Sequence, residues 1–528
     1  MKNFLNPLVL CVFLVFLGMS CSKDNIVSID PITTDDADDN ISNTEFTQTV
    51  QVAFSASGEA TVSGTDADFT VTVSGNDVTI IYTGEEYVMY ELSGSSTDGF
   101  FKLYSAKKQG LTLNGVSITN PNGAAINVQG PTATPNKGKR TFIVLNGDNA
   151  LADGTTYSDT PSTEDEKAVL FGEGQFVFSG TGTLNVTATG KSGIVSDDYL
   201  HFMGDCGITV NMSTSATVSG SDTLKPACIK GKDYVRMTSG ALTLISTGTG
   251  GKGISSDGNG YFNGGTVAIY AHGSNFGSSG GGGGGFPGGG GNSSSNSVAA
   301  KGIKCDGNLV FTGGRVIVNS VAHEAIEAKG SITVSGGEVV GISQADDAIN
   351  SGGDFTISGG HVFGFSAGND GLDSNGDFYI KGGVVYAIGA SSPEVAIDAN
   401  TEDRKSLYIT GGTLIAIGGL ENGTSSNWSQ SCYSASSWSQ NTWYGLTVGS
   451  KTYAFMTQSS GGTPLVVSGE STPTLQSGVT YSGGTSYFEN WLFEDASFSG
   501  GTSVSLSSYT GGSGGGGGPG GGGGHGPF

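Results

Sequence analysis

The sequence predicts an all-β protein whose body is a parallel β-helix of about ten coils, with a β cap at each end. Three observations support this fold class. Glycine accounts for 92 of the 528 residues, a Gly-Gly pair recurs at a fixed spacing, and short segments that alternate apolar and polar residues lie between the pairs. Alternation with a period of two is typical of a strand that buries one face, and a fixed spacing indicates a repeat architecture.

Two sequence marks that run in phase define the repeat. The first glycines of four successive Gly-Gly pairs are Gly313, Gly336, Gly359 and Gly382, at steps of 23 residues. Strands at a fixed phase would stack about 4.8 Å apart, with aliphatic residues inside and glycine supplying positive φ at the corners. A sandwich of β-hairpins is the alternative, and it fits the constant step poorly. The second mark is a small residue followed by an aliphatic one, and it occurs at Ala125-Ile126, Ala168-Val169, Gly193-Ile194, Cys228-Ile229, Gly253-Ile254, Gly302-Ile303, Ala325-Ile326, Ala348-Ile349, Gly371-Leu372 and Ala396-Ile397.

Changes of phase and composition divide the chain into segments. Four tryptophans fall after residue 418, where the phase is lost and large side chains would cover the end of a solenoid. We predict a lipoprotein signal peptide at 1–20, an acidic flexible tether at 21–45, an N-terminal β segment or cap at 46–110, the parallel β-helix at 111–418 with a Gly/Ser insert at 273–297, a C-terminal β cap at 419–509, and a disordered glycine-rich tail at 510–528.

The N-terminus indicates export and lipidation. Lys2 precedes the short apolar run 13–17, and Gly18 and Ser20 lead to Cys21, which is the pattern of a lipobox whose cysteine is acylated. Gly18 stands where leucine is usual, so an ordinary secretory signal is the alternative. The segment Ser22–Asn25 resembles the tag that directs Bacteroidota lipoproteins to the outer face of the outer membrane. We therefore predict a lipid anchor in the outer membrane and exposure at the cell surface.

Charge and cysteine content restrict the partners. A formal net charge of −24 argues against nucleic acid, and an acidic partner would need a cation between the two surfaces. Outside the signal and Cys21, the cysteines are Cys206, Cys228, Cys305 and Cys432, without CxxC spacing. A metal-thiolate site is therefore disfavoured, and the sequence leaves open whether these cysteines are buried and free or include one disulfide.

Several segments resemble one bacterial family in their amino-acid sequence and in their order along the chain. They are 111–120 (LTLNGVSITN) leading into 123–126 (GAAI), then 251–258 (GKGISSDG), 302–307 (GIKCDG) and 347–350 (DAIN). The family is the carbohydrate-binding parallel β-helix family typified by the clostridial cellulose- and polygalacturonate-binding protein, and the likeness covers roughly Val78 to Ile417. It implies a right-handed, pectate-lyase-like β-helix that binds calcium and plant-wall polysaccharide.

An acidic column accompanies the small–aliphatic mark, at the same step of 23 residues. Like charges one coil apart would repel by roughly 3–4 kcal/mol at an effective dielectric of about 20, and calcium takes oxygen ligands of this kind. A solvated acidic face with its side chains pointing outward is the alternative. The predicted calcium ligands are Glu324, Glu327, Asp346, Asp347, Asn350, Asp370, Asp373 and Asp398, flanked by Asn369 and Glu394.

These features favour calcium-dependent, non-catalytic binding of a polysaccharide such as pectin, polygalacturonate or a cellulose-like glucan. One alternative is a pectate-lyase-like enzyme, with Lys304 or Arg315 as the base in a β-elimination. Lys301 and Lys304 precede the acidic column and could instead form its salt-bridged end. A surface adhesin that uses calcium only for rigidity is the other alternative. No sugar-binding residue is assigned, because core packing is the preferred interpretation of the candidate aromatics Tyr270, Phe363, Phe365 and Tyr386.

Overall fold

The computed structural model describes residues 36–511, with gaps at 135–136, 159–163, 221, 278–296 and 422–426. This part of the chain is all-β, and its helical elements are three short 3-10 turns. The predicted signal peptide, Cys21, the segment Ser22–Asn25, most of the glycine-rich tail and most of the Gly/Ser insert lie outside the described residues. Within them, no helix is both long and apolar enough to cross a membrane.

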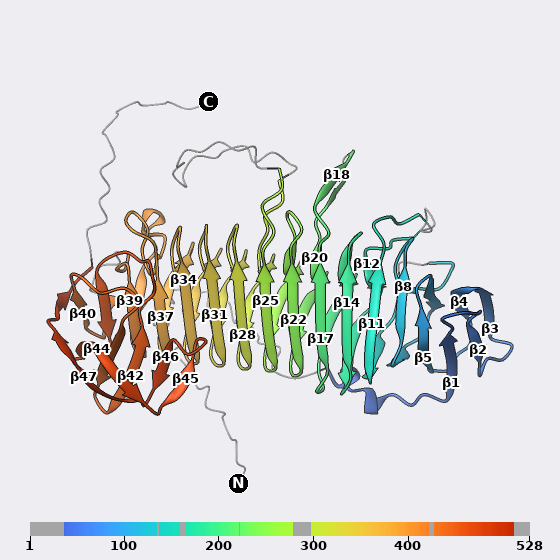
Figure 1. Ribbon diagram of the computed structural model, residues 1–528, viewed down its shortest axis with the longest axis horizontal. Helices are drawn as coiled ribbons and strands as arrows, with labels where there is room; N and C mark the ends of the chain where they lie inside the picture. The colour runs from blue at the N-terminus through green and yellow to red at the C-terminus, as the bar shows by residue number, and fades with distance from the viewer. Residues whose placement is uncertain are drawn as a thin grey trace, which may run out of the picture. The chain divides into compact units, whose positions relative to one another are not determined.

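Three series of parallel strands run along the described part, and the repeats add strands to each series in turn. Figure 1 shows one of these series face-on. Ladder 1, which contains the small–aliphatic mark, forms a sheet of its own with β3 (Phe69–Ser74) antiparallel at its start. Its parallel strands are β4 (Asn76–Tyr82), β6 (Gly99–Ser105), β9 (Ile126–Gln129), β12 (Ala168–Gly172), β15 (Ser192–Ser196), β20 (Ala227–Gly231), β23 (Lys252–Ser256), β26 (Ile303–Cys305), β29 (Ile326–Ala328), β32 (Ile349–Ser351) and β35 (Leu372–Ser374).

Ladder 2 follows ladder 1 within each repeat. β2 (Thr61–Ser63) pairs antiparallel with its first strand. Its parallel strands are β1 (Gln48–Phe54), β5 (Val88–Ser96), β7 (Gln109–Asn114), β10 (Thr141–Asn146), β13 (Phe176–Gly180), β16 (Tyr199–Phe202), β21 (Tyr234–Met237), β24 (Asn259–Phe262), β27 (Leu309–Phe311), β30 (Ile332–Val334), β33 (Phe355–Ile357), β36 (Phe378–Ile380) and β38 (Leu407–Ile409).

Ladder 3 completes the repeat and begins beside the end of β5. Its strands are β8 (Ser117–Asn120), β11 (Asp148–Asp153), β14 (Thr183–Ala188), β17 (Gly207–Met212), β22 (Ala241–Ser246), β25 (Thr266–Ala271), β28 (Arg315–Ser320), β31 (Glu338–Ser343), β34 (His361–Ser366), β37 (Val384–Ile388) and β39 (Thr413–Ile417). The parallel pairing therefore starts before residue 111, since β4, β5 and β6 already take part in it.

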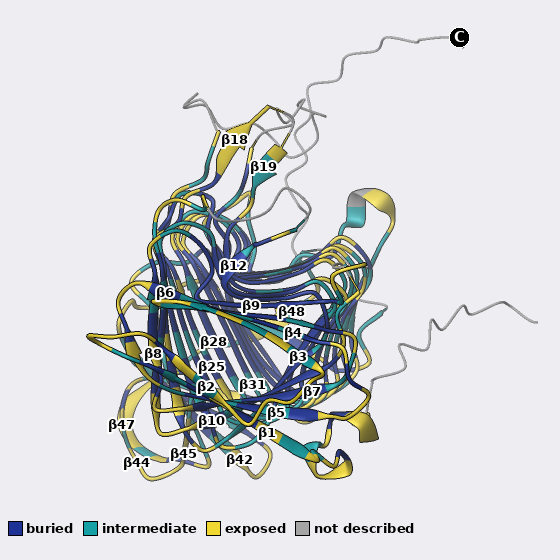
Figure 2. Ribbon diagram, turned by 90° about the vertical axis from the view of Figure 1, so that its right-hand side faces the viewer, coloured by how far each residue is buried: buried dark blue, intermediate teal, exposed yellow. Residues whose placement is uncertain are grey.

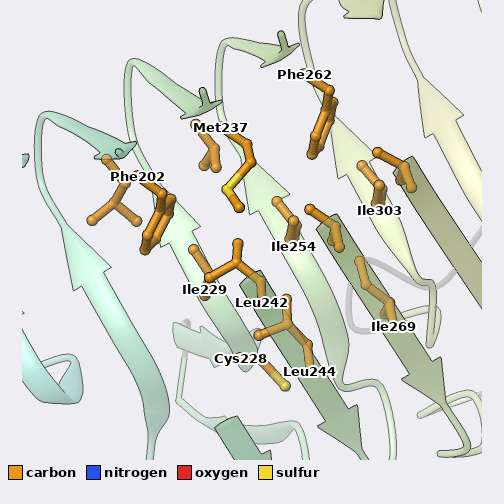
Figure 3. Packing of buried hydrophobic residues seen from close by; sticks show 14 of the residues in the cluster. Phe202, Cys228, Ile229, Met237, Leu242, Leu244, Ile254, Phe262, Ile269 and Ile303 are labelled. Carbon is orange, nitrogen blue, oxygen red and sulfur yellow. The ribbon is translucent and has the colours of Figure 1, made fainter. Parts of the chain in front are cut away.

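The core lies between the ladders and is built from side chains that repeat at the same phase. Ile254 pairs with Ile303 and Ile303 with Ile326, and all three are fully buried. Figure 3 shows Ile254 and Ile303 together with residues of ladders 2 and 3, such as Phe262 and Ile269, pointing into one interior. Viewed from one end of the described part, buried residues line the inside and exposed residues gather at the corners (Figure 2). Regular alternation thus gives each strand one apolar face that the neighbouring coils cover.

One mark of the repeat was assigned one residue too early. The strand register aligns Leu170, not Val169, with Ile126 and Ile194. Ala168 instead packs in a separate small cluster with Phe171. Ala168-Val169 has the small–aliphatic composition of the mark, so the sequence pattern favoured Val169. The loops on both sides vary in length, so the 23-residue step could not distinguish Val169 from Leu170.

The two glycines of each corner have different tasks. The second glycine has positive φ, +80° at Gly337 and +74° at Gly360, as the sequence predicted. The first has no such backbone; a Cβ at Gly336 would lie 2.4 Å from the carbonyl oxygen of Thr312 in the preceding coil. Glycine is therefore needed once for conformation and once for close stacking.

The segment after residue 35 is docked rather than flexible, which corrects the prediction of a tether reaching residue 45. It forms the 3-10 turns η1 (Ala37–Asp39) and η2 (Ile41–Asn43). Asp39 is 1% exposed, and its carboxylate pairs with Arg140 at 2.9 Å and His201 at 2.8 Å. Composition suggested a solvated acidic run, but Arg140 and His201 lie more than 100 residues away and could not be assigned as partners from the sequence.

Beyond β39 the strands become antiparallel, although isolated parallel bridges still join Leu420 to Ile397 and Trp428 to Ile409. β40 (Cys432–Ala435), β43 (Leu465–Ser468) and β48 (Ser507–Tyr509) extend the end of ladder 3. The four cysteines Cys206, Cys228, Cys305 and Cys432 are buried and free. The remaining C-terminal strands form a six-stranded antiparallel sheet: β45 (Thr485–Tyr487), β46 (Leu492–Glu494), β42 (Lys451–Met456), β41 (Trp443–Val448), β44 (Thr474–Ser482) and β47 (Ser497–Val504). Two smaller elements project from the repeats, the hairpin of β18 (Thr217–Ser219) with β19 (Asp222–Leu224) and the turn η3 (Thr401–Asp403).

Candidate metal centre

The predicted calcium ligands lie on or beside ladder 1, in two columns along the stack. Strand pairing places Glu327 next to Asn350 and Asn350 next to Asp373, and an isolated bridge carries the register on to Asp398. Because side chains alternate along a strand, these residues point away from the buried aliphatics that precede them. The second column precedes the strands by two residues and consists of Glu324, Asp347 and Asp370, which are 5%, 5% and 7% exposed.

The first column has a further member, Glu421, that the sequence analysis did not include. The residues that precede Asp398 and Glu421 pair with each other, so the two acids occupy neighbouring coils. The Glu421 carboxylate accepts a hydrogen bond from the Ala399 backbone N–H at 3.2 Å and another from the Thr401 hydroxyl at 2.5 Å. The signal for this residue is the aliphatic–acidic pair at 420–421, which repeats the pair at 397–398 after another 23 residues.

The first acids of the columns are already paired with cations of the protein. The ammonium of Lys301 pairs with Glu324 at 2.9 Å and also contacts Glu327, which Lys329 contacts from the other side. Burial opposes ionisation of Glu327, but the two lysines outweigh it and lower the pKa of this carboxyl. The predicted salt-bridged end of the column is therefore present, with Lys301 rather than Lys304 as its main cation.

Asp346 is also paired, through an imidazole. His323 lies 2.7 Å from Asp346 and also contacts Glu324. The ligand atoms of these three side chains lie within 4.8 Å of one another, which is close enough for them to coordinate one metal ion. However, the two carboxylates outweigh the effect of burial and raise the pKa of His323 to about 9, so at neutral pH the ring carries a proton. A protonated imidazole has no lone pair for a metal, and the ring itself acts as the cation.

The later acids form a second group without such cations. Within the described part of the chain, no Lys, Arg or His pairs with them. Their partners are neutral: Asn350 donates to Asp347 at 2.9 Å, and the backbone N–H of Val395 donates to Asp370 at 2.6 Å. We call this group the open acidic row; its members are Asp347, Asp370, Asp373, Asp398 and Glu421.

Burial and mutual repulsion disfavour ionisation of the four aspartates of the open acidic row. Burial raises the pKa of Asp347 and Asp370 well above the usual range, and neighbouring carboxylates raise it further. The pKa of Asp373 and Asp398 is raised for the same reasons, with Glu421 among the neighbours in both cases. Each group is costly as an unpaired anion, so the row needs protons or an added cation.

A hard divalent cation fits this donor set. The Oδ1 atom of Asp398 is buried and has no hydrogen-bond partner among the described residues. The row offers carboxylate oxygens only, and Asn350 adds an amide oxygen in the same column. Calcium binds six to eight oxygens of this type, whereas zinc and copper favour nitrogen or sulfur.

The two candidate lyase bases lie away from the open acidic row. Lys304 is in register with Glu327, three strand steps of about 4.8 Å from Asp373, or roughly 14 Å. Its ammonium contacts Asp306. Arg315 belongs to ladder 3 and pairs with Glu338 at 2.9 Å. Both cations are held by their own carboxylates, so neither is placed to remove a proton beside an ion in the row.

Most of the candidate sugar-binding aromatics are core residues. Phe363, Phe365 and Tyr386 are at most 8% exposed and pack in an apolar cluster with the C-terminal sheet. Tyr270 is 38% exposed. Tyr379 was not among the predicted candidate aromatics. Its ring stacks on that of Tyr408, on the next strand of ladder 2, with 4.8 Å between the centroids. The ammonium of Lys381 also lies over the Tyr379 ring, 4.6 Å from its centroid, so this ring is packed against a cation as well as against Tyr408.

Comparison with known proteins identifies a family. The model of the carbohydrate-binding domain-containing protein family matches residues 74–348. No curated protein matches the sequence. One solved structure, of the polysaccharide lyase-like protein from C. thermocellum in a gadolinium derivative, is similar at 17% identity with a TM-score of 0.35, and the alignment covers 63% of this chain and 99% of that one. Since the family match spans more than half of the chain, the protein belongs to the family of carbohydrate-binding domain-containing proteins.

Proposed function

We propose that this protein binds polysaccharide without cleaving it, through calcium held by the open acidic row. The observation that carries the proposal is a row of five buried or half-buried carboxylates that form no ion pair with any described Lys, Arg or His, in a member of a carbohydrate-binding family. Asp373, Asp398 and Glu421 would hold the ion from the strand column, and Asp347 and Asp370 from the preceding turns. When bound, calcium supplies a positive charge where the chain has only negative ones.

We further propose that the body is a right-handed parallel β-helix of about ten coils. Three ladders with constant register, and one strand in each ladder per repeat, support this architecture. In a stack of this kind a column of side chains has the spacing of the coils. An extended polymer lying along ladder 1 would therefore meet an ordered row rather than a single point.

The chemistry of the row favours an acidic polysaccharide. With a net charge of −24, the protein repels a polyuronate over most of its surface. Neutral hydrogen-bond donors compensate the carboxylates of Asp347 and Asp370 only in part, so both would still act as ligands of the ion. A uronate carboxylate could then complete the coordination shell of the calcium ion. Neutral glucans offer hydroxyl groups alone and should bind more weakly. The proposed ligand class is thus polygalacturonate or a related polyuronate.

The proposed location is the outer face of the outer membrane, with Cys21 as the lipid anchor. The short apolar segment before Cys21 supports this address. Replacing Cys21 by alanine should move the protein from the membrane fraction to the soluble fraction. Persistence of the Cys21→Ala protein in membranes would count against the lipid anchor.

Retention on immobilised polygalacturonate tests the function. We expect retention to need calcium, to vanish with a chelator, and to weaken at least tenfold in Asp373→Asn/Asp398→Asn. Asp306→Asn is the matched control, because Asp306 lies near ladder 1 but pairs with Lys304. Equal retention of charged and neutral glycans, indifferent to calcium, would refute the proposal. Failure to retain any glycan while calcium still stabilises the fold would favour a structural adhesin, and release of unsaturated sugar would favour a lyase.

A further inference from the structure

A second acidic cluster lies on the same sheet, several coils before the open acidic row. Glu173 directly follows β12 and Asp197 directly follows β15. These strands pair in register, which places the two acids at equivalent positions of neighbouring coils. Asp165 approaches from the loop before β12, and ligand atoms of the three carboxylates lie within 4.8 Å of one another.

Unpartnered oxygens distinguish this cluster from a solvated acidic patch. Glu173 is 7% exposed, and its Oε1 atom is buried without a hydrogen-bond partner in the described part of the protein. Gln129 occupies the equivalent position one coil earlier, since Val128 pairs with Gly172. It is fully buried, and its Oε1 atom also has no partner there. Unsatisfied buried oxygens on adjacent coils are rare, because each costs roughly 1–3 kcal/mol.

One lysine does not satisfy this set. Lys167 pairs with Asp165 at 3.0 Å and also contacts Asp197, but makes no ion pair with Glu173 among the described residues. Among the described residues, these three carboxylates therefore have the ammonium of Lys167 as their one ion-pair partner, and Glu173 does not reach it. The side chains of Asp165 and Asp197 are 52% and 18% exposed, so the cluster extends from the buried oxygen of Glu173 to the protein surface.

We propose that Asp165, Glu173 and Asp197 form a second site for a hard divalent cation of the calcium class, independent of the open acidic row. The ion would take one oxygen from each carboxylate, and the amide oxygen of Gln129 is available on the adjoining coil. Water would supply the rest of a shell that is open on the Asp165 side. Lys167 would then compete with the ion for Asp165 and Asp197, which tunes the affinity of the site.

Calorimetric titration of the full-length protein with calcium chloride tests this site. In Asp373→Asn/Asp398→Asn, where the open acidic row is disabled, we expect calcium binding at one remaining site. Adding Glu173→Gln should weaken that binding at least tenfold. Glutamine has the shape of a protonated glutamate, so the fold should be kept, and circular dichroism checks it. Asp257→Asn is the matched control on ladder 1, because Asp257 pairs with Lys230 at 3.2 Å and should leave binding unchanged.

The outcomes separate the two proposals. If the row-disabled protein binds no calcium, or binds equally well after Glu173→Gln, the second site is refuted. Asp197→Asn provides an independent variant, and unchanged binding there would also overturn the proposal. If wild type and the row-disabled protein bind the same number of ions, and Glu173→Gln weakens that binding, the calcium role of the open acidic row fails, whereas the second site stands.

Discussion

Replacing Asp398 by asparagine should have opposite effects on stability with and without calcium. The isolated bridges at Ile397 place Asp398 between Asp373 and Glu421. Two unit charges about 4.8 Å apart repel by roughly 3.5 kcal/mol at an effective dielectric of about 20. Protonation relieves part of this repulsion, so neutralising Asp398 should stabilise the calcium-free protein by about 3 kcal/mol. Saturating calcium, at about 1,000 times its Kd, should stabilise the wild type by about 4 kcal/mol and the variant much less.

Thermal unfolding measures both effects. An unfolding entropy of about 2.1 cal/mol/K per residue makes 1 kcal/mol worth about 1 °C for a body of nearly 500 residues. The Asp398→Asn protein should therefore melt about 3 °C above the wild type in chelator, and below it in calcium. Asp306→Asn should show no reversal, since Lys304 pairs with that carboxylate. If the variant melts below the wild type in both buffers, Asp398 is a structural acid and the reasoning on the row is wrong.

Three other changes test the fold. Asp39→Ala should destabilise the protein by about 1–3 kcal/mol, because it removes the buried carboxylate that pairs with Arg140 and His201, while Arg140 keeps its pairs with Asp36 and Asp38; unchanged melting would show that the N-terminal segment is not docked. Gly337→Ala, with positive φ and a Cβ 2.7 Å from the preceding coil, should cost at least about 2 kcal/mol, and Gly115→Ala, with positive φ but no atom within 4 Å, should cost about 1; equal denaturant midpoints for the two would exclude a stacking role. Lys252→Met removes a buried ammonium whose pKa burial and neighbouring lysines lower to about 7. The unfolded chain therefore binds a proton that the folded protein lacks between about pH 7 and pH 10.5, so wild-type stability should rise with pH there. Lys252→Met should raise the free energy of unfolding by on the order of 2 kcal/mol at pH 6 and by less at pH 9. An equal rise in melting temperature at the two pH values would contradict this.

The repeat was readable from the sequence wherever its step is constant. From Gly313 to Gly382 the step never varies, and the paired strands there have the register that the step implies. Where loops interrupt the step, composition alone gave the wrong residue at Val169. The acidic column was visible for the same reason, but it was ended one coil early at Asp398, because the chain beyond residue 418 was taken to have lost its phase.

Pairing between side chains could not be read in this way. The step places Lys301 and Lys304 equally well before the acids, yet only Lys301 contacts both Glu324 and Glu327. Which lysine makes these contacts depends on the side-chain rotamers and on the direction in which each lysine side chain leaves the backbone. The docking of Asp39 on Arg140 and His201 likewise joins residues with no shared period. Periodicity predicts neighbours along the stack, whereas contacts between turns and distant segments depend on the folded surface.

Constant register across loops of different length has an evolutionary consequence. Ile254 pairs with Ile303 although 48 residues separate them, and Ile303 pairs with Ile326 after 22. Doubling the length of a flexible loop costs only about 0.6 kcal/mol in closure entropy. Selection can therefore lengthen, shorten or rewrite the loops that border ladder 1 without displacing any carboxylate on it. Recognition of new ligands and retention of an ionic row can then be inherited as separate traits.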